Sequence, residues 1–267
     1  MNFLADDNQS TYFQKSPLNP GGPVADRILT VFWPIFWVSV VIFVGVSLAI
    51  IYGALRYRRK SDAEEPAQVH GNNRLEIAWT LIPFAILVSL FIVTFVNMGF
   101  INNLSADQKA ASINVCVQGE RFDWSYIYMD TATCPPQRNT PSGGVTFVPT
   151  NKSTPTSSTL VVPVGHPVQL KLVSTDVNHS FFIPQLAGQV NAIPGQTNEL
   201  WFQVDNPGTY HGACTELCGT NHYSMLVCID AKSETDYFQW LNDKKAGKTS
   251  SVKVAACTYP PPPGGTS

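Results

Sequence analysis

The most distinct pattern in the chain is a pair of long apolar runs that carry no charge. The first covers 28–55 (ILTVFWPIFWVSVVIFVGVSLAIIYGAL) and the second covers 77–101 (IAWTLIPFAILVSLFIVTFVNMGFI). Roughly 20 apolar residues cross the hydrocarbon core of a bilayer as a helix, so both runs are long enough. Phe, Val, Ile and Leu occupy every face of each run, unlike the single apolar face of an amphipathic helix. The pattern predicts a transmembrane hairpin over 28–104, with helices at about 28–55 and 76–103 joined by the loop 56–74.

After Leu104 the pattern changes to short β-type runs separated by turn residues. These runs lie at 113–118, 123–129, 159–164, 168–173, 180–183, 198–204 and 225–230. Seven short strands with regular turn signals are typical of an antiparallel sandwich or barrel. We therefore expect an all-β domain over 105–247, and the N-terminal segment 1–27 precedes the hairpin.

Three segments of this second half fall outside the strand pattern. Residues 131–158 are rich in Thr, Ser and Pro, which predicts a long surface loop with little regular structure. Residues 233–245 (SETDYFQWLNDKK) predict a helix with Ser233 as its N-cap and two lysines in its last turn. The segment 248–267 ends in TYPPPPGGTS, which predicts an exposed tail.

The distribution of basic residues indicates the orientation in the membrane. The connection 56–74 holds five Lys or Arg residues, whereas the 27 residues before the first run hold two. By the positive-inside rule we expect this loop in the cytoplasm, and both termini and the β domain outside. In a bacterium this describes a multi-pass protein of the inner (plasma) membrane, in contact with lipid, whose domain faces the periplasmic side. Residues 102–267 hold 12 acidic and 10 basic residues, a balance that does not suggest a nucleic-acid partner.

The segment 211–227 (HGACTELCGTNHYSMLV) concentrates metal-ligating side chains. Cys214, Cys218, His222 and Met225 lie within twelve positions of a chain that has only six Cys and four Met. A zinc site would leave Met225 unused, because a thioether is a poor zinc ligand. A mononuclear blue-copper site uses one Cys, two His and a weak Met, and would leave Cys214 unused. Two thiolates that bridge two copper ions would use every soft ligand in the segment.

A two-copper site needs a second histidine from outside this segment. His70 falls on the cytoplasmic side of the expected topology, and His166 lies in a Gly-His-Pro turn. His211 lies only three residues before Cys214, which is too close for it to be an obvious choice as the second ligand. His179, in DVNHSFFIP, lies at the start of a predicted strand, so we expect it to be the second imidazole ligand.

Three segments resemble subunit II of the haem-copper cytochrome c oxidase family: HGNNRLEIAWTLIP (70–83), STDVNHSFFIPQL (174–186) and GTYHGACTELCGTNHYSM (208–225). The resemblance covers nearly the whole chain and implies that the β domain is a cupredoxin-like Greek-key barrel or sandwich. It also implies a binuclear copper centre bridged by Cys214 and Cys218. The other implied ligands are the imidazoles of His179 and His222, the thioether of Met225 and the backbone carbonyl of Glu216. The Glu216 side chain would reach a magnesium ion shared with subunit I.

The same resemblance implies an electron-transfer function. The outer domain would accept electrons from a cytochrome c-type donor and pass them to haem in subunit I, where oxygen is reduced to water with proton translocation. Glu76 matches a carboxylate at the mouth of a proton pathway in subunit I. The chain has no Cys-x-x-Cys-His motif, so we expect no haem in it. Two further hypotheses stay open: a stand-alone, membrane-tethered copper-binding protein, and a mononuclear blue-copper carrier.

Two stretches depart from the family pattern. The family has Gly-x-Gln-Trp-x-Trp-x-Tyr where this chain has GERFDWSYIY, with Phe122 at the first Trp position and Trp124 at the second. Both are candidates for the point of electron entry. Gln189, Asn191 and Gln196 replace charged residues of the family, so attraction of a free cationic cytochrome would be weak. We therefore expect a donor that is held in the membrane or in a complex.

Four cysteines lie outside the copper segment. Cys116 and Cys228 occur in apolar strand contexts and are expected to be small buried residues. Cys134 and Cys257 occur in Pro-rich, loop-like surroundings. In an oxidising compartment these two are candidates for a disulfide, although sequence alone does not determine the pairing.

Overall fold

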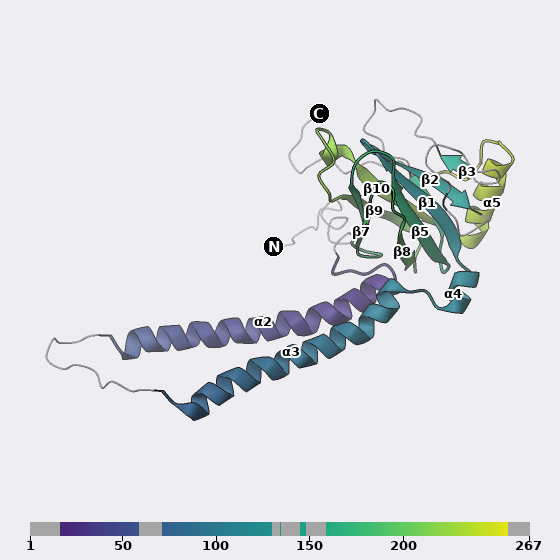
Figure 1. Ribbon diagram of the computed structural model, residues 1–267. Coiled ribbons are helices and arrows are strands. Elements are labelled where there is room, and N and C mark those ends of the chain that lie inside the picture. Colours follow the sequence, from purple (N-terminus) through teal and green to yellow (C-terminus); the bar gives the residue numbers. More distant parts are fainter. Residues whose placement is uncertain (1–16, 59–70, 130–133, 135–144, 148–158, 256–267) are drawn as a thin grey trace, which may run out of the picture. The chain divides into compact units, whose positions relative to one another are not determined.

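Two long apolar helices come first in the chain and a β domain follows (Figure 1). The computed structural model describes residues 17–58, 71–129, 134, 145–147 and 159–255. Helix α2 spans Pro23–Arg56 and helix α3 spans Asn73–Asn102. Nearly all the large apolar side chains that are exposed among the described residues lie on these helices. Both helices are long and apolar enough to cross a membrane, in agreement with the predicted fold class.

Both helices begin earlier than the apolar runs predicted. Pro23 occupies the first position of α2, where its missing N–H costs no hydrogen bond. Asn72 precedes α3, and its side-chain oxygen accepts hydrogen bonds from the backbone N–H groups of Arg74 (3.1 Å) and Leu75 (3.3 Å). The apolar runs show which part of each helix is hydrophobic, whereas Pro23 and Asn72 determine where the helices begin.

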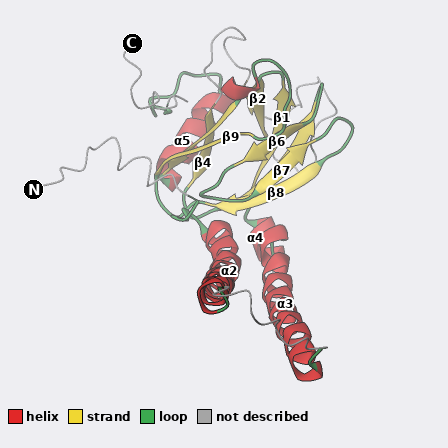
Figure 2. Ribbon diagram, turned by 90° about the vertical axis from the view of Figure 1, so that its left-hand side faces the viewer, coloured by secondary structure: helices red, strands yellow, loops and turns green. Residues whose placement is uncertain are grey.

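The β domain contains two five-stranded sheets (Figure 2). The first has the order β3 (Val145–Phe147), β2 (Asp123–Met129), β1 (Ile113–Glu120), β5 (Pro167–Ser174) and β8 (Asn198–Gln203). The second has the order β4 (Thr159–Pro163), β10 (Leu226–Lys232), β9 (Gly208–Cys214), β6 (His179–Phe182) and β7 (Gln189–Ala192). The predicted sandwich is confirmed, but it is not purely antiparallel. The pairs β1–β5 and β10–β4 run parallel.

Three strands and two short helices were not predicted from the sequence. Strands β3 and β7 are at sheet edges, where a strand pairs on one side only and needs no clear apolar alternation. Strand β3 also lies inside the segment that was expected to be irregular. Strand β9 is central but contains Gly208 and Gly212, which obscure its pattern. The short helices are α4 (Ala106–Ala110) and the 3₁₀ turn η1 (His222–Ser224).

The C-terminal helix α5 (Glu234–Lys245) agrees with the prediction, including its N-cap. The Ser233 hydroxyl accepts a hydrogen bond from the backbone N–H of Asp236 at 3.2 Å. Tyr237 and Trp240 project from α5 and are fully buried. They join a core that contains Trp124, Tyr126 and Phe181, also fully buried. Rigid aromatic side chains therefore pack among the more numerous aliphatic side chains of this core.

The segment before α2 takes part in the packing of the β domain. The backbone N–H of Gly21 donates to the carbonyl of Gln185 at 2.7 Å, and its own carbonyl accepts from the N–H of Asp205 at 2.9 Å. The side chain of Val24 is fully buried in the core of this domain. Gly21, just before α2, is thus hydrogen-bonded to segments that follow β6 and β8.

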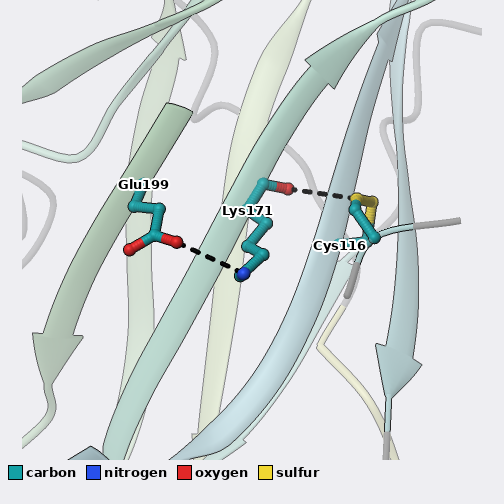
Figure 3. The surroundings of a disulfide bond; sticks show 4 residues. Cys116, Lys171 and Glu199 are labelled. Atoms are coloured by element: carbon teal, nitrogen blue, oxygen red, sulfur yellow. Dashed lines mark hydrogen bonds and ion pairs between the residues drawn. A yellow bond between two sulfur atoms is a disulfide. The ribbon is translucent and has the colours of Figure 1, made fainter. Parts of the chain in front are cut away.

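The candidate pairing of Cys134 with Cys257 is wrong. Cys134 forms a disulfide with Cys116 of β1, and the two Cα atoms are 5.3 Å apart (Figure 3). Cys228 is also disulfide-bonded, so neither it nor Cys116 is a free buried thiol. Cys257 lies outside the described residues. A disulfide requires a Cα–Cα distance of about 4.4 to 6.8 Å, which sequence context does not reveal.

The C-terminal segment is not wholly exposed as predicted. The backbone N–H of Ala255 donates to Asp230 Oδ2 at 2.6 Å, and the Thr159 hydroxyl donates to the Ala255 carbonyl at 2.9 Å. Val252 packs against the core. Hydrogen bonds between the Ala255 backbone and side chains of β4 and β10 therefore hold this part of the tail. The segment 256–267 lies outside the described residues.

Candidate metal centre

Three connections between strands come together around one site. They are the β1–β2 turn, the β5–β6 connection and the loop between β9 and β10. The backbone N–H of Arg121 in the first donates to Asp176 Oδ2 in the second at 2.9 Å. The ring of Phe122 lies against Gly219 of the third, where an added Cβ would come within 3.0 Å of it. Residues from both sheets therefore surround the site.

Three predicted ligands form its centre. The ligand atoms of His179, Cys214 and Cys218 all lie within 4.8 Å of one another, and all three residues are buried. The Nε2 atom of His179 lies 2.8 Å from Asp176 Oδ1, whereas its buried Nδ1 has no hydrogen-bond partner. A buried imidazole nitrogen without a partner is costly unless it binds a ligand. The arrangement fits a metal held by one nitrogen and two sulfur atoms.

The remaining three predicted donors adjoin these sulfur atoms. The Nδ1 atom of His222 lies 3.5 Å from Cys218 Sγ, and the Met225 Sδ atom lies 3.8 Å from the same sulfur. The carbonyl oxygen of Glu216 lies 3.3 Å from Cys214 Sγ. The structure therefore brings all six predicted donor atoms into one cluster.

Backbone hydrogen bonds fix the loop that carries five of these donors. The N–H of Cys214 donates to the carbonyl of Met225 at 2.9 Å and thereby closes the two ends of the loop. The N–H of Thr215 donates to the carbonyl of Ser180, next to His179, at 3.2 Å. Gly219 adopts φ +141°, a conformation that other residues rarely take. These hydrogen bonds therefore hold the donors of the loop close to one another.

The two thiols influence each other electrostatically. Burial, followed by the charge of Cys214, raises the pKa of Cys218 to about 12. Burial also opposes ionisation of Cys214, but the adjacent His179 imidazole, followed by backbone groups of Ser180 and Glu216, lowers its pKa below the usual value. Two adjacent thiolates in a buried site need a cation to be stable together. A metal ion would meet this need.

The chemistry of the donor set favours copper. Thiolate and thioether sulfur are soft ligands that suit copper, and imidazole suits it equally. Zinc binds thiolate and imidazole but makes little use of a thioether. Met225 is fully buried with its sulfur directed at Cys218, so the thioether belongs to the site.

Two aromatic residues proposed for electron entry occupy different positions beside the cluster. Trp124 is fully buried, and its ring centroid lies 5.8 Å from that of His179. Phe122 is half-buried against Gly219 of the ligand loop. A Cβ at Gly119 would lie 2.9 Å from the His179 ring and 3.0 Å from the Trp124 ring. Glycine at this position allows the two rings to meet.

Asp176 and Arg121 contact the site but were not anticipated. Burial opposes the charge of Asp176, but hydrogen bonds from His179, Arg121 and Val177 lower its pKa to about 2. The carboxylate is therefore ionised. The sequence signal for the role of Asp176 is its place three positions before the candidate ligand His179. Acidic residues are common in loops, so this spacing is not specific by itself.

Other predicted residues lie outside the cluster. The carboxylate of Glu76 accepts a hydrogen bond from the backbone N–H of Asn72 at 3.3 Å, at the start of α3. The Nε2 atom of His166 lies 3.4 Å from a carboxylate oxygen of Glu234, as expected for a surface residue. His211 lies beside the disulfide-bonded Cys228. His70 lies outside the described residues.

Comparison with protein families gives two matches along the chain. The model of the periplasmic domain of cytochrome c oxidase subunit II matches residues 113–232. The model of the transmembrane domain of the same subunit matches residues 8–96. Together the two matches cover well over half of the chain.

Individual proteins and one solved structure are also similar in sequence to this chain. A cytochrome c oxidase subunit 2 of Alkalihalophilus pseudofirmus is 32% identical over 237 residues, covering 86% of this chain and 62% of that protein. The chain thus spans less than two thirds of this relative. The corresponding protein of Cereibacter sphaeroides is 30% identical over 265 residues, covering 93% and 84%. A crystal structure of the periplasmic domain of cytochrome oxidase subunit II of Bradyrhizobium japonicum also matches, with 26% sequence identity and a TM-score of 0.42. The match covers 51% of this chain and 96% of the chain in that structure.

Proposed function

Since the chain belongs to the cytochrome c oxidase subunit II family, we propose that it holds a binuclear copper centre through which a haem-copper oxidase receives electrons. The observation that carries this proposal is the cluster of six donors around two adjacent buried thiols. The proposed ligands are His179, Cys214, the carbonyl of Glu216, Cys218, His222 and Met225. Electrons would come from a cytochrome c-type donor and continue to haem in subunit I, where oxygen is reduced to water.

The residues of this chain would hold the centre in a fixed geometry. Bound copper would supply the one-electron redox change. Cys214 and Cys218 would hold the two ions through their sulfur atoms, which are neighbours and buried. The loop hydrogen bonds described above resist movement of the ligands when the charge of the site changes. Burial of His179 and Met225 excludes water from the inner side of the site.

Two aromatic positions support a route for electrons from the surface. We propose that Phe122, at the surface side, and Trp124, in contact with His179, form the entry region. Leu217 and Tyr223 are each 81% exposed and flank the ligands Cys218 and His222 in the chain. Exposed apolar side chains at this position suit contact with a partner protein.

The donor is proposed to be held in the membrane or in a complex, because the outer domain is close to charge balance. We expect the oxidation rate of a free basic cytochrome c by the purified complex to be slow and to change little between 20 and about 200 mM salt, conditions over which Debye screening changes strongly. Stopped-flow measurement across this range tests the expectation. Rapid oxidation that falls steeply with salt would contradict it.

Three further roles follow from family membership as proposals. The chain would lie in the bacterial inner membrane beside subunit I, with both termini and the copper domain on the outer side. The Glu216 carboxylate would bind a magnesium ion shared with subunit I. Glu76, at the start of α3, would lie at the entrance of a proton pathway, although its hydrogen bond to Asn72 also serves the helix end.

Electron paramagnetic resonance of the full-length chain, purified in detergent and loaded with copper, tests the proposed centre. We expect a hyperfine pattern from one unpaired electron shared equally by two copper nuclei. A four-line pattern from one copper nucleus would instead indicate a mononuclear carrier. Retention of zinc in preference to copper would contradict the proposal and indicate a structural site.

A further inference from the structure

Asp176 joins the proposed ligand His179 to a cation at the protein surface. Its Oδ1 atom lies 2.8 Å from His179 Nε2, and its Oδ2 atom accepts from the backbone N–H of Arg121 (2.9 Å) and from Arg121 Nε (3.2 Å). The His179 side chain is fully buried, that of Asp176 is 22% exposed, and that of Arg121 is 49% exposed. A continuous hydrogen-bonded path therefore leads from solvent to the metal site.

The carboxylate determines which nitrogen of His179 is available. An ionised carboxylate only accepts hydrogen bonds, so the proton of the neutral ring must be on Nε2. The lone pair is then on Nδ1, the buried nitrogen that has no hydrogen-bond partner. Contacts with Gly119 and Trp124 restrict rotation of the ring. Asp176 thus orients the imidazole with its lone pair toward the two sulfur atoms.

The guanidinium of Arg121 determines how strongly the carboxylate acts. A carboxylate beside a metal ligand increases the electron-donating strength of the ligand and favours the more positive, oxidised state. A cation hydrogen-bonded to the same carboxylate opposes this effect.

Resting on the proposed copper function, we propose that Asp176 is a positioning residue for His179 and that Arg121 sets the reduction potential of the centre through Asp176. Two substitutions that each remove one charge should then shift the potential in opposite directions. Arg121→Gln keeps the backbone hydrogen bond to Asp176 and removes the opposing cation. Asp176→Asn keeps the size of the side chain and removes the anion.

Spectroelectrochemical titration of the full-length, copper-loaded chain in detergent measures these shifts. We expect Arg121→Gln to lower the equilibrium constant for reduction and Asp176→Asn to raise it, each by roughly tenfold, which is about 59 mV for one electron. Asp176→Asn should also change the copper hyperfine splitting, because His179 is held less firmly. Altered splitting would not follow from a loss of fold stability alone.

The ion pair between Lys171 and Glu199 provides the matched control. The Nζ atom of Lys171 lies 3.2 Å from Glu199 Oε1, on β5 and β8 beside the Cys116 disulfide (Figure 3). Lys171→Gln removes one cation from the same domain without altering the Asp176 hydrogen bonds. We expect its equilibrium constant to change by less than about twofold. Shifts of the two test variants that match this control, or that have the same sign, would overturn the proposal.

A metal-free measurement covers the case in which Asp176→Asn binds no copper. Nitrogen-15 NMR of the metal-free chain, at a pH high enough to keep the imidazole neutral, should show the Nε2-protonated form of His179 in the wild type and a mixture of forms in Asp176→Asn. An unchanged single form in the variant would overturn the positioning role. A wild-type chain without a two-copper signal would overturn the proposed function and this inference together, whereas a normal wild-type signal with unmoved potentials overturns only the inference.

Discussion

Replacing Cys214 with serine is expected to abolish the two-copper spectrum and to slow electron transfer in the assembled oxidase by more than about 100-fold. Serine keeps nearly the same shape, but its hydroxyl is a hard ligand that stays protonated and cannot bridge two soft ions. Changes in outer-shell residues typically cost roughly 10- to 100-fold, so a larger loss marks a direct ligand. Paramagnetic resonance and oxygen uptake of the purified complex measure the two effects.

Cys116 and Cys134, which form a disulfide outside the donor cluster, supply the control for this result. The double variant Cys116→Ser, Cys134→Ser removes a disulfide on the first sheet but no donor of the cluster. It should lower the melting temperature and leave the copper spectrum unchanged. A mononuclear carrier predicts a different outcome, because Cys214→Ser would then keep a one-copper signal and most of its transfer rate.

Gly212→Ala is expected to produce the largest loss of stability among single methyl additions in the copper domain. An added Cβ would lie 1.8 Å from the carbonyl oxygen of Phe182 and 2.9 Å from its carbon. These are backbone atoms of β6, so no side-chain rotation relieves the clash, and the strands must separate. We expect a loss of about 3 kcal/mol or more. Thermal unfolding followed by near-ultraviolet circular dichroism should show a melting temperature lower by roughly 6 to 12 °C.

The same variant should lose copper, because separation of these strands separates two ligands. His179 begins β6 and Cys214 ends β9, and Phe181 pairs with Cys214 across the two strands. Gly188→Ala is the matched control, since its Cβ would meet only the side chain of Ile28, at an ordinary 3.9 Å. A Gly212→Ala protein that melts like this control and binds copper normally would contradict the importance of the close strand approach.

The sequence was informative where a single local segment carries the structure. The two helices could be predicted from uncharged runs because a helix makes its backbone hydrogen bonds within its own segment and needs no distant partner. Cys214, Cys218, His222 and Met225 lie on one loop, so their spacing alone indicated a soft-metal site. His179 was found only by exclusion among the histidines, since strand pairing brings β6 beside β9.

Features that depend on distant contacts were missed or predicted wrongly. The parallel pairing of β1 with β5 has no local signal, because it joins strands about 50 residues apart. The partner of Cys134 depends on where the chain crosses the first sheet. Asp176 acquires its role only when the β5–β6 connection meets the β1–β2 turn at Arg121. In each case the decisive quantity is a distance between segments, which composition and periodicity do not contain.

The hydrogen bonds of Gly21 constrain the order of events during biosynthesis. Gly21 leaves the ribosome first, whereas its partners Gln185 and Asp205 are made more than 160 residues later. At typical rates of translation this interval lasts roughly 10 to 30 seconds. Both apolar helices emerge within it and can enter the membrane while the Gly21 backbone is still hydrated. Gly21 can therefore dock only after the β domain has been made and has folded, so its docking marks a late step in the folding of the chain.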